Sequence, residues 1–252
     1  MADLKSIVQF LDESLNTCGI PDYPGAMNGL QLQNNGEVTK VASAVDASLP
    51  VIRKAVEAGA DMLIVHHGLF WQGAQRFVDA QYSKIKEAMD ANLAIYSSHI
   101  PLDVHPEWGN NALLAKSIGL ENAESYHDWK GILLGVKGIV SASLDELVAK
   151  VTDAVESPVH VCKGKSDGGV GVVGVITGGA GSEVAAMANQ GIQTFITGEG
   201  PHWSFSLAEE LGINVIYAGH YASETFGVRE LSRVLEKKYE LNTQFIHHPT
   251  GL

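Results

Sequence analysis

Apolar residues recur at helical spacing near the start of the chain. Charged residues stand among them, so this segment is typical of an amphipathic helix over residues 3–16 and not of a signal peptide. Gly19 marks the end of the helix. The apolar positions on its one face are Leu4, Ile7, Val8, Leu11 and Leu15. Without a signal peptide, the protein is expected to be cytoplasmic.

Strand-like and helix-like segments alternate from residue 40 onward. The stretch KVASAVDAS predicts a strand, Ser48 is suited to cap the next helix and Gly59 to end it, and DMLIV predicts a second strand. A further helix near residues 80–91 precedes the short apolar strand LAIYSS. Strands that alternate with helices in this way favour a parallel sheet.

The second half of the chain repeats this order. After HDWKG the pattern restarts with the strand ILLGVK, a helix opened by the capping box of Ser143 and Glu146, and the strand VHVCKG. The segment that follows aligns with residues 41–68 at a constant offset of 132. The next strand aligns at an offset of 121, which pairs Tyr96 with Tyr217, His99 with His220 and Asp103 with Glu224. The sequence therefore predicts an α/β fold of two duplicated units with mostly parallel sheets, divided into residues 1–126 and 127–252.

Composition and charge exclude several classes of protein. With 45% hydrophobic and 18% charged residues, the chain is typical of a globular α/β protein and not of a disordered one. No apolar run reaches the roughly 18 residues that a membrane span requires, so no membrane association is expected. The net charge of -12 opposes attraction to phosphate backbones, which makes duplex nucleic acid an unfavourable partner.

Residues that can bind metal follow several of the predicted strands. Ligands gather at the carboxyl ends of parallel strands, so these positions carry the most functional weight. They hold His66, His67, His99, Asp103, Glu199, His220 and Glu224. Imidazole and carboxylate are donors that Zn, Mn, Fe and Ni share. The side chains of His66 and His67 diverge in extended backbone, so this pair suits two neighbouring ions.

A structural role is the alternative for each histidine taken singly, because a lone histidine after a strand is more often hydrogen-bonded than metal-bound. The co-location of several ligand types favours a metal site for the group. The other histidines are expected to be structural, with His105 near enough to Asp103 to support it, and the doublet in the C-terminal tail is expected to be solvated. These others are His105, His127, His160, His202, His247 and His248.

A glycine-rich turn, ITGGAGSE, offers a competing interpretation. It lies between a strand and a helix, as in dinucleotide-binding folds. The full motif needs a glycine where Val184 stands, and the duplicated first half has VDAS instead of glycines. The sequence therefore predicts no nucleotide cofactor, while anion binding by this turn stays open.

Five segments together resemble a known family. MNGLQ, IVHHGLFW, SSHIPLDVHPEWGNNALLA, TGE and AGHYASETFGVRELSRVL are similar, in order, to the YbgI-like or Nif-three-like dinuclear metal centre family, whose members are named GTP cyclohydrolase I type 2 homologues. The resemblance runs almost end to end. It implies two interlocked α/β halves, a site for two divalent ions (Zn, Fe, Mn or Ni), and a toroidal homohexamer. Carried over to this chain, the implied metal ligands are His66, His67, Asp103, His220 and Glu224.

The resemblance implies a hydrolase, and opening of the guanine ring of GTP is the reaction for which the family is named. We therefore expect a metal-dependent hydrolase that acts on a small nucleotide-like substrate. The alternative is a regulatory or storage protein that binds the same metal without turnover. The internal repeat adds one expectation, that His99 and Glu199 also face the metal and act as catalytic groups that move protons.

Overall fold

The computed structural model describes residues 1–71, 73, 75–164 and 169–252. The chain forms two compact units. Unit 1 contains residues 1–102 and 227–248, and unit 2 contains residues 103–226 and 249–252. These bounds differ from the halves 1–126 and 127–252, which describe a duplication in the sequence and stay a prediction. Among the described residues, no helix has the length and apolar character needed to cross a membrane.

Unit 1 is built on a five-stranded sheet. The strand order is β13-β4-β5-β6-β2, and only the β6–β2 pair is antiparallel. The strands are β2 (Gly29–Leu32), β4 (Lys40–Asp46), β5 (Met62–His67), β6 (Ala94–Ser97) and β13 (Asn242–Phe245). A separate short pair consists of β1 (Ala2–Asp3) and β3 (Glu37–Val38). The predicted α/β class with parallel strands is confirmed.

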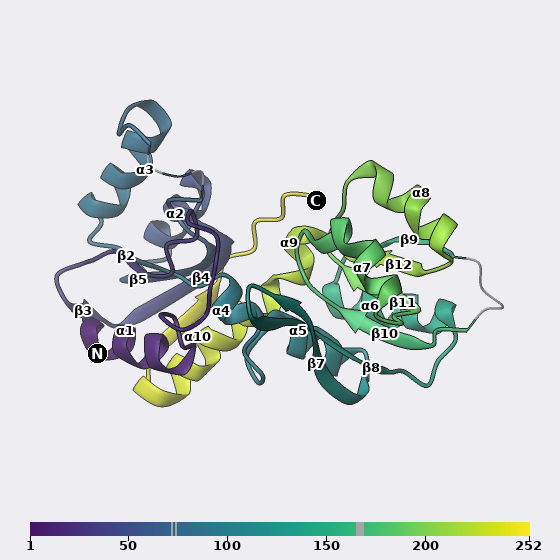
Figure 1. The fold of residues 1–252 in the computed structure, drawn as a ribbon. Helices are drawn as coiled ribbons and strands as arrows, with labels where there is room; N and C mark the ends of the chain where they lie inside the picture. The colour runs from purple at the N-terminus through teal and green to yellow at the C-terminus, as the bar shows by residue number, and fades with distance from the viewer. Residues whose placement is uncertain (72, 74, 165–168) are drawn as a thin grey trace. The chain divides into compact units, whose positions relative to one another are not determined.

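Helices cover both faces of the unit 1 sheet (Figure 1). α2 and α3 pack on one face through a cluster that includes Ile52, Leu63 and Ile95, while α1 and α10 contact each other through Phe10 and Tyr239. The Ser48 hydroxyl caps α2 by accepting from the Val51 N–H, as predicted. The helices are α1 (Leu4–Ser14), α2 (Leu49–Glu57), α3 (Asp79–Asp90) and α10 (Thr225–Tyr239), which enters unit 1 at Gly227.

Unit 2 is built on a six-stranded mixed sheet of order β7-β8-β10-β11-β12-β9. The central strands β10, β11 and β12 are parallel, and the other pairings are antiparallel. The strands are β7 (Glu121–Trp129), β8 (Ile132–Ile139), β9 (His160–Cys162), β10 (Val172–Val175), β11 (Thr194–Thr197) and β12 (Asn214–Tyr217). Parallel pairing in unit 2 is thus confined to the strands that carry the repeat.

Two layers of helix cover the unit 2 sheet. Neighbouring residues of one strand face opposite layers, so Ile196 packs with α5 and α6 whereas Phe195 packs with α7 and α8. The capping box of Ser143 and Glu146 opens α6, as predicted. Of α4 (Ile100–Asp103), only Asp103 belongs to unit 2. The other helices are α5 (Asn110–Ser117), α6 (Leu144–Val155), the 3-10 helix η1 (Ala180–Glu183), α7 (Val184–Asn189), α8 (His202–Leu211) and α9 (His220–Ser223).

The strand registers of the two sheets coincide. Val41 pairs with Met62 in unit 1, and Val173 pairs with Thr194 in unit 2, which is the predicted offset of 132 at both positions. In the third strand, Ala94 corresponds to Asn214, so the offset there is 120 and Tyr96 corresponds to Ile216, not Tyr217. Gly219, with a φ of +85°, is the extra residue that restores the offset of 121 at His220. The shared register supports the proposed duplication.

Candidate metal centre

Three histidines gather at the carboxyl end of the unit 1 sheet. His66 and His67 end β5, and His99 follows the neighbouring parallel strand β6. Their ring centroids lie 4.8 to 5.6 Å apart. One ligand nitrogen of each ring lies within 4.8 Å of the other two, which is close enough for the three side chains to hold a metal ion. The strand-end rule therefore located this cluster correctly.

Hydrogen bonds fix the orientation of each of these rings. In every case the Nδ1 atom meets an oxygen that can only accept, so Nδ1 carries the hydrogen and the Nε2 lone pair is the donor that a metal can use. The pairs are His66 Nδ1 with Ser98 O at 2.9 Å, His67 Nδ1 with Asp46 Oδ1 at 2.9 Å, and His99 Nδ1 with Asp22 Oδ1 at 2.8 Å. This is the arrangement by which proteins select the tautomer of a metal-binding histidine.

The supporting carboxylates Asp22 and Asp46 were not predicted from the sequence. Asp46 ends β4, the strand next to β5, so the strand-end rule that selected the histidines applies to it too. Asp22 lies in the irregular loop before β2, where no periodic pattern marks it. Burial raises the pKa of Asp22, but hydrogen bonds from His99, Asn28 and the Tyr23 N–H outweigh it, and the net pKa is lowered. Asp22 is therefore an anion beside His99.

Aromatic rings border the unit 1 cluster. The Trp71 ring centroid lies 5.0 Å from that of His67 and 4.5 Å from that of His99, and Tyr23 lies 6.1 Å from His99. Tyr23 is 50% exposed and Trp71 is 41% exposed, so both rings also reach the surface of the protein. A ligand that enters the histidine cluster from this side meets these rings.

A second cluster in unit 2 centres on His220. This residue begins α9 directly after β12. Its Nδ1 donates to Glu199 Oε1 at 2.8 Å, and its Nε2 lies 3.3 Å from Glu224 Oε2. Glu224 is 2% exposed. Burial lowers the pKa of His220, but the two carboxylates outweigh it and raise the pKa to about 9. Without a metal, His220 is thus protonated at neutral pH, and a divalent cation at Nε2 would take the place of that proton.

The glycine-rich turn before η1 makes room for Glu224. A Cβ atom on Gly178, whose φ is +68°, would collide with the Glu224 carboxylate. Three N–H groups of this turn donate to protein oxygens within unit 2. Gly178 N donates to Ser223 Oγ at 3.1 Å, Ala180 N to Thr197 Oγ1 at 3.2 Å and Gly181 N to Glu199 O at 2.9 Å. The turn therefore shapes the His220 cluster, and protein oxygens accept from three of its N–H groups.

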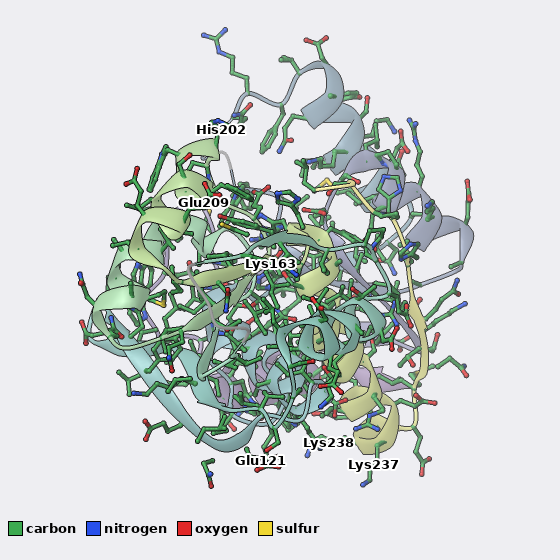
Figure 2. The ribbon with its side chains drawn as sticks, turned by 90° about the vertical axis from the view of Figure 1, so that its right-hand side faces the viewer. Glu121, Lys163, His202, Glu209, Lys237 and Lys238 are labelled. Carbon is green, nitrogen blue, oxygen red and sulfur yellow. The ribbon has the colours of Figure 1, made fainter. Side chains whose placement is uncertain are left out.

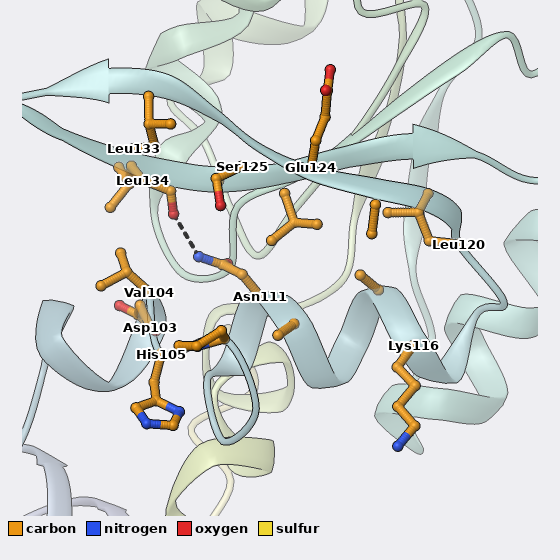
Figure 3. Close-up of a pocket in the computed structure, with 16 residues that line it drawn as sticks. Asp103, Val104, His105, Asn111, Lys116, Leu120, Glu124, Ser125, Leu133 and Leu134 are labelled. Atoms are coloured by element: carbon orange, nitrogen blue, oxygen red, sulfur yellow. Dashed lines mark hydrogen bonds between the residues drawn. The ribbon is translucent and has the colours of Figure 1, made fainter. Parts of the chain in front are cut away.

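Asp103, the remaining predicted ligand, is buried in unit 2. Its Oδ1 accepts from Asn110 Nδ2 at 2.8 Å and from Thr177 Oγ1 at 3.4 Å. Asp103 also lines a cavity of about 410 Å³ between α5 and the β7–β8 pair, in which Asn111 reaches the Leu134 carbonyl (Figure 3). The Asn111 amide oxygen in turn accepts from the Thr177 N–H at 2.8 Å. These contacts hold the Asp103 carboxylate in one orientation.

The predicted residues fall into two groups. His66, His67 and His99 lie together in unit 1, whereas Asp103, Glu199, His220 and Glu224 lie in unit 2. His105 accepts from the N–H groups of Glu107 and Trp108 and stacks on the Trp108 ring, as expected of a structural residue. In the tail, Lys54 Nζ contacts the His247 carbonyl and the His248 ring. The set of five metal ligands draws on both units and stays a prediction.

Comparisons with known proteins match nearly the whole chain. The family model described as Duf34/NIF3 (NGG1p interacting factor 3) matches residues 2–250. A relative from Pyrococcus horikoshii is 40% identical over 99% of this chain and 100% of its own length, and one from Deinococcus radiodurans is 37% identical over 98% and 93%. Both relatives are named GTP cyclohydrolase 1 type 2 homolog.

Solved structures of similar proteins share the fold. The protein ybgI, described as of unknown function, superposes with a TM-score of 0.92 at 32% identity over 100% of both chains. The protein TTHA1606 from Thermus thermophilus has a TM-score of 0.88 at 34% identity, also over 100% of both chains. Reduced HcgD from Methanocaldococcus jannaschii has a TM-score of 0.87 at 29% identity over 98% of both chains. The sequence resemblance to the YbgI-like family is therefore confirmed.

Proposed function

The chain belongs to the Duf34/NIF3 family, and from that premise we propose that it is a dinuclear metal-dependent hydrolase acting on a small nucleotide-like substrate. The observation that carries this proposal is the shared orientation of four histidines. His66, His67, His99 and His220 each direct Nδ1 to a carbonyl or carboxylate oxygen. Metal-binding histidines typically donate their second ring N–H in this way, which leaves Nε2 for the metal.

The ligands in this proposal are the five residues that the family resemblance implies. Three neutral imidazoles and two carboxylates exceed what one tetrahedral ion takes, so they fit two ions. The donor set suits Zn, Fe, Mn or Ni. The burial of Asp103 at 6% and Glu224 at 2% exposed supports this assignment, because buried carboxylates require a compensating cation or several hydrogen bonds. The five ligands are His66, His67, Asp103, His220 and Glu224.

Bound divalent ions would supply the Lewis acidity that activates water and polarises the bond under attack. The protein's own contribution is to orient the groups and to move protons. Glu199 holds the His220 ring through Nδ1, and its side chain is 43% exposed, so it can exchange a proton with a substrate or with solvent. His99, fixed by Asp22, is suited to act as a base or to orient the attacked group.

The names of the relatives support a nucleotide-like substrate, and a turnover assay tests it. Protein loaded with Zn, Mn or Fe is incubated with a panel of nucleoside triphosphates, and products are separated by chromatography and identified by mass. The proposal predicts metal-dependent conversion of at least one nucleotide. Metal binding without any product across the panel would favour the alternative, a regulatory or storage protein.

Two variants separate the roles of the carboxylates. Glu199→Gln is expected to keep the metal and lose turnover, because it removes a proton carrier while its amide can still hold His220. Glu224→Gln is expected to lose metal, because it removes a charged ligand. Equal loss of metal in both variants, measured by elemental analysis, would contradict this division of roles.

The family resemblance also supports an assembly of six chains in a ring. Light scattering tests this proposal, since a hexamer has about six times the 26.9 kDa mass of one chain. A particle that stays at the mass of one chain over a range of protein and salt concentrations would rule out the hexamer.

A further inference from the structure

A second cavity opens in unit 2 beside Glu199. It has a volume of about 450 Å³ and lies where β11 ends and α8 begins. Its lining includes the rings of His160 on β9, Phe205 on α8 and Tyr217 on β12. The His160 ring centroid lies 5.4 Å from that of Phe205 and 6.1 Å from that of Tyr217, with interplanar angles of 34° and 28°. The cavity wall is therefore aromatic, with the His160 ring inclined to the other two rings.

Glu199 is the acidic residue among the side chains that line this cavity. Glycines flank Glu199, and a Cβ atom on Gly198 would collide with the Gly178 carbonyl oxygen, while one on Gly200 would collide with Gly181. Neighbouring chain segments thus approach closely here, and Glu199 projects from between them. One carboxylate oxygen accepts from His220 Nδ1, and the side chain is 43% exposed to the cavity and solvent.

The aromatic walls are held by contacts outside the cavity. The Tyr217 hydroxyl pairs with Ser204 Oγ at 2.7 Å, which fixes the tyrosine ring. The Phe205 carbonyl accepts from the Cys162 thiol at 3.4 Å. His202 and Glu209, labelled in Figure 2, mark the first and last turns of α8, and Phe205 lies on the helix between them. The tyrosine ring and the backbone that carries the phenylalanine ring are therefore held in place.

We propose that this cavity binds a planar nitrogen heteroaromatic ring, which stacks on His160 and Phe205 and donates N–H groups to Glu199. Stacking faces select a flat ring, and a carboxylate acceptor at the edge selects one that carries N–H donors. The volume exceeds that of a bicyclic ring and leaves space for an attached sugar. One part of this proposal rests on the proposed function, namely that the ring belongs to the substrate. Glu199 lines the cavity and also accepts from His220, so a ring bound here lies next to the His220 cluster.

Binding is tested on the full chain, first without metal. Saturation-transfer NMR is recorded with guanosine, adenosine, cytidine and uridine as probes, and with ribose as a probe that lacks the ring. The proposal predicts stronger saturation of the base protons than of the sugar protons, and no signal for ribose. Phe205→Leu keeps apolar bulk but removes the ring face, and His160→Ala changes an exposed residue, so each is expected to weaken binding about fivefold or more.

Trp203→Leu is the matched control. Trp203 lies on the same helix and is 51% exposed, but it does not line the cavity, so this variant is expected to bind the probes as the wild type does. Metal content and thermal unfolding of Phe205→Leu are measured alongside. If that variant fails to fold, His160→Ala decides the outcome alone.

The outcomes separate this proposal from the proposed function. Absence of base-proton saturation for all four nucleosides, or equal weakening by Trp203→Leu and the two cavity variants, would overturn the ring site. Turnover with an unchanged KM in the cavity variants would also overturn it while the hydrolase proposal stands. Ring binding by a protein that shows no turnover would support the ring site and contradict the hydrolase proposal.

Discussion

Protonation of His220 is expected to stabilise the metal-free protein. The pKa of His220 is raised to about 9 by Glu224 and Glu199 against an ordinary value of 6.5. A raised histidine pKa contributes stability that is fully present below pH 6.5 and is lost as pH rises through about 9. The difference between the two values corresponds to at most about 3 kcal/mol. Because Glu199 is 43% exposed, solvent screening reduces this to on the order of 2 kcal/mol.

The assay is urea unfolding in the presence of a chelator at pH 6.5 and at pH 9.5. His220→Gln is the comparison, because glutamine can bond to both carboxylates but does not titrate. The wild type is expected to lose about 2 kcal/mol more unfolding free energy than the variant over this range. The same loss in both proteins, or a wild type that gains stability relative to the variant, would refute the reasoning.

Three other perturbations test parts of the site. Asp22→Asn is expected to lower turnover about 10- to 100-fold while metal content stays unchanged, because it removes the carboxylate that holds His99, which is not one of the five proposed ligands; unchanged turnover would count against this role. Cobalt binding is expected to quench Trp71 fluorescence, so Trp71→Phe should lose most of the quenching that Trp203→Phe retains. Gly178→Ala is expected to lower both Tm and metal content, whereas Gly191→Ala, which also has a positive φ but open space around it, should lower Tm only.

The sequence predicted the elements whose signals are local. β5 is a continuous apolar run, α2 carries a capping serine, and α6 carries a capping box, and all three lie where expected. β7 was not predicted, because its first five residues are exposed and show no apolar alternation. Its position depends on pairing with β8, and such pairing is not visible in the pattern of one segment.

The candidate site likewise contains residues that the sequence predicted and residues that it did not. The strand-end rule found His66, His67 and His99 because parallel neighbouring strands end at the same edge of the sheet. It missed Asp22, which reaches His99 from a loop 77 residues away in the sequence. The glycine-rich turn was open to an anion-binding interpretation because sequence alone does not show that Gly178 makes room for Glu224. The sequence pattern therefore located the residues at strand ends, but it did not show contacts between segments that are distant along the chain.

Metal content per chain tests the central proposal most directly. Elemental analysis is performed on wild-type protein and on the His66→Ala, His67→Ala double variant after exhaustive dialysis. We predict about two divalent ions per wild-type chain and loss of metal in the double variant, with cooperative unfolding retained because both imidazoles lie outside the apolar cluster of unit 1. A wild-type protein without metal, or a double variant that keeps its metal, would contradict the proposal.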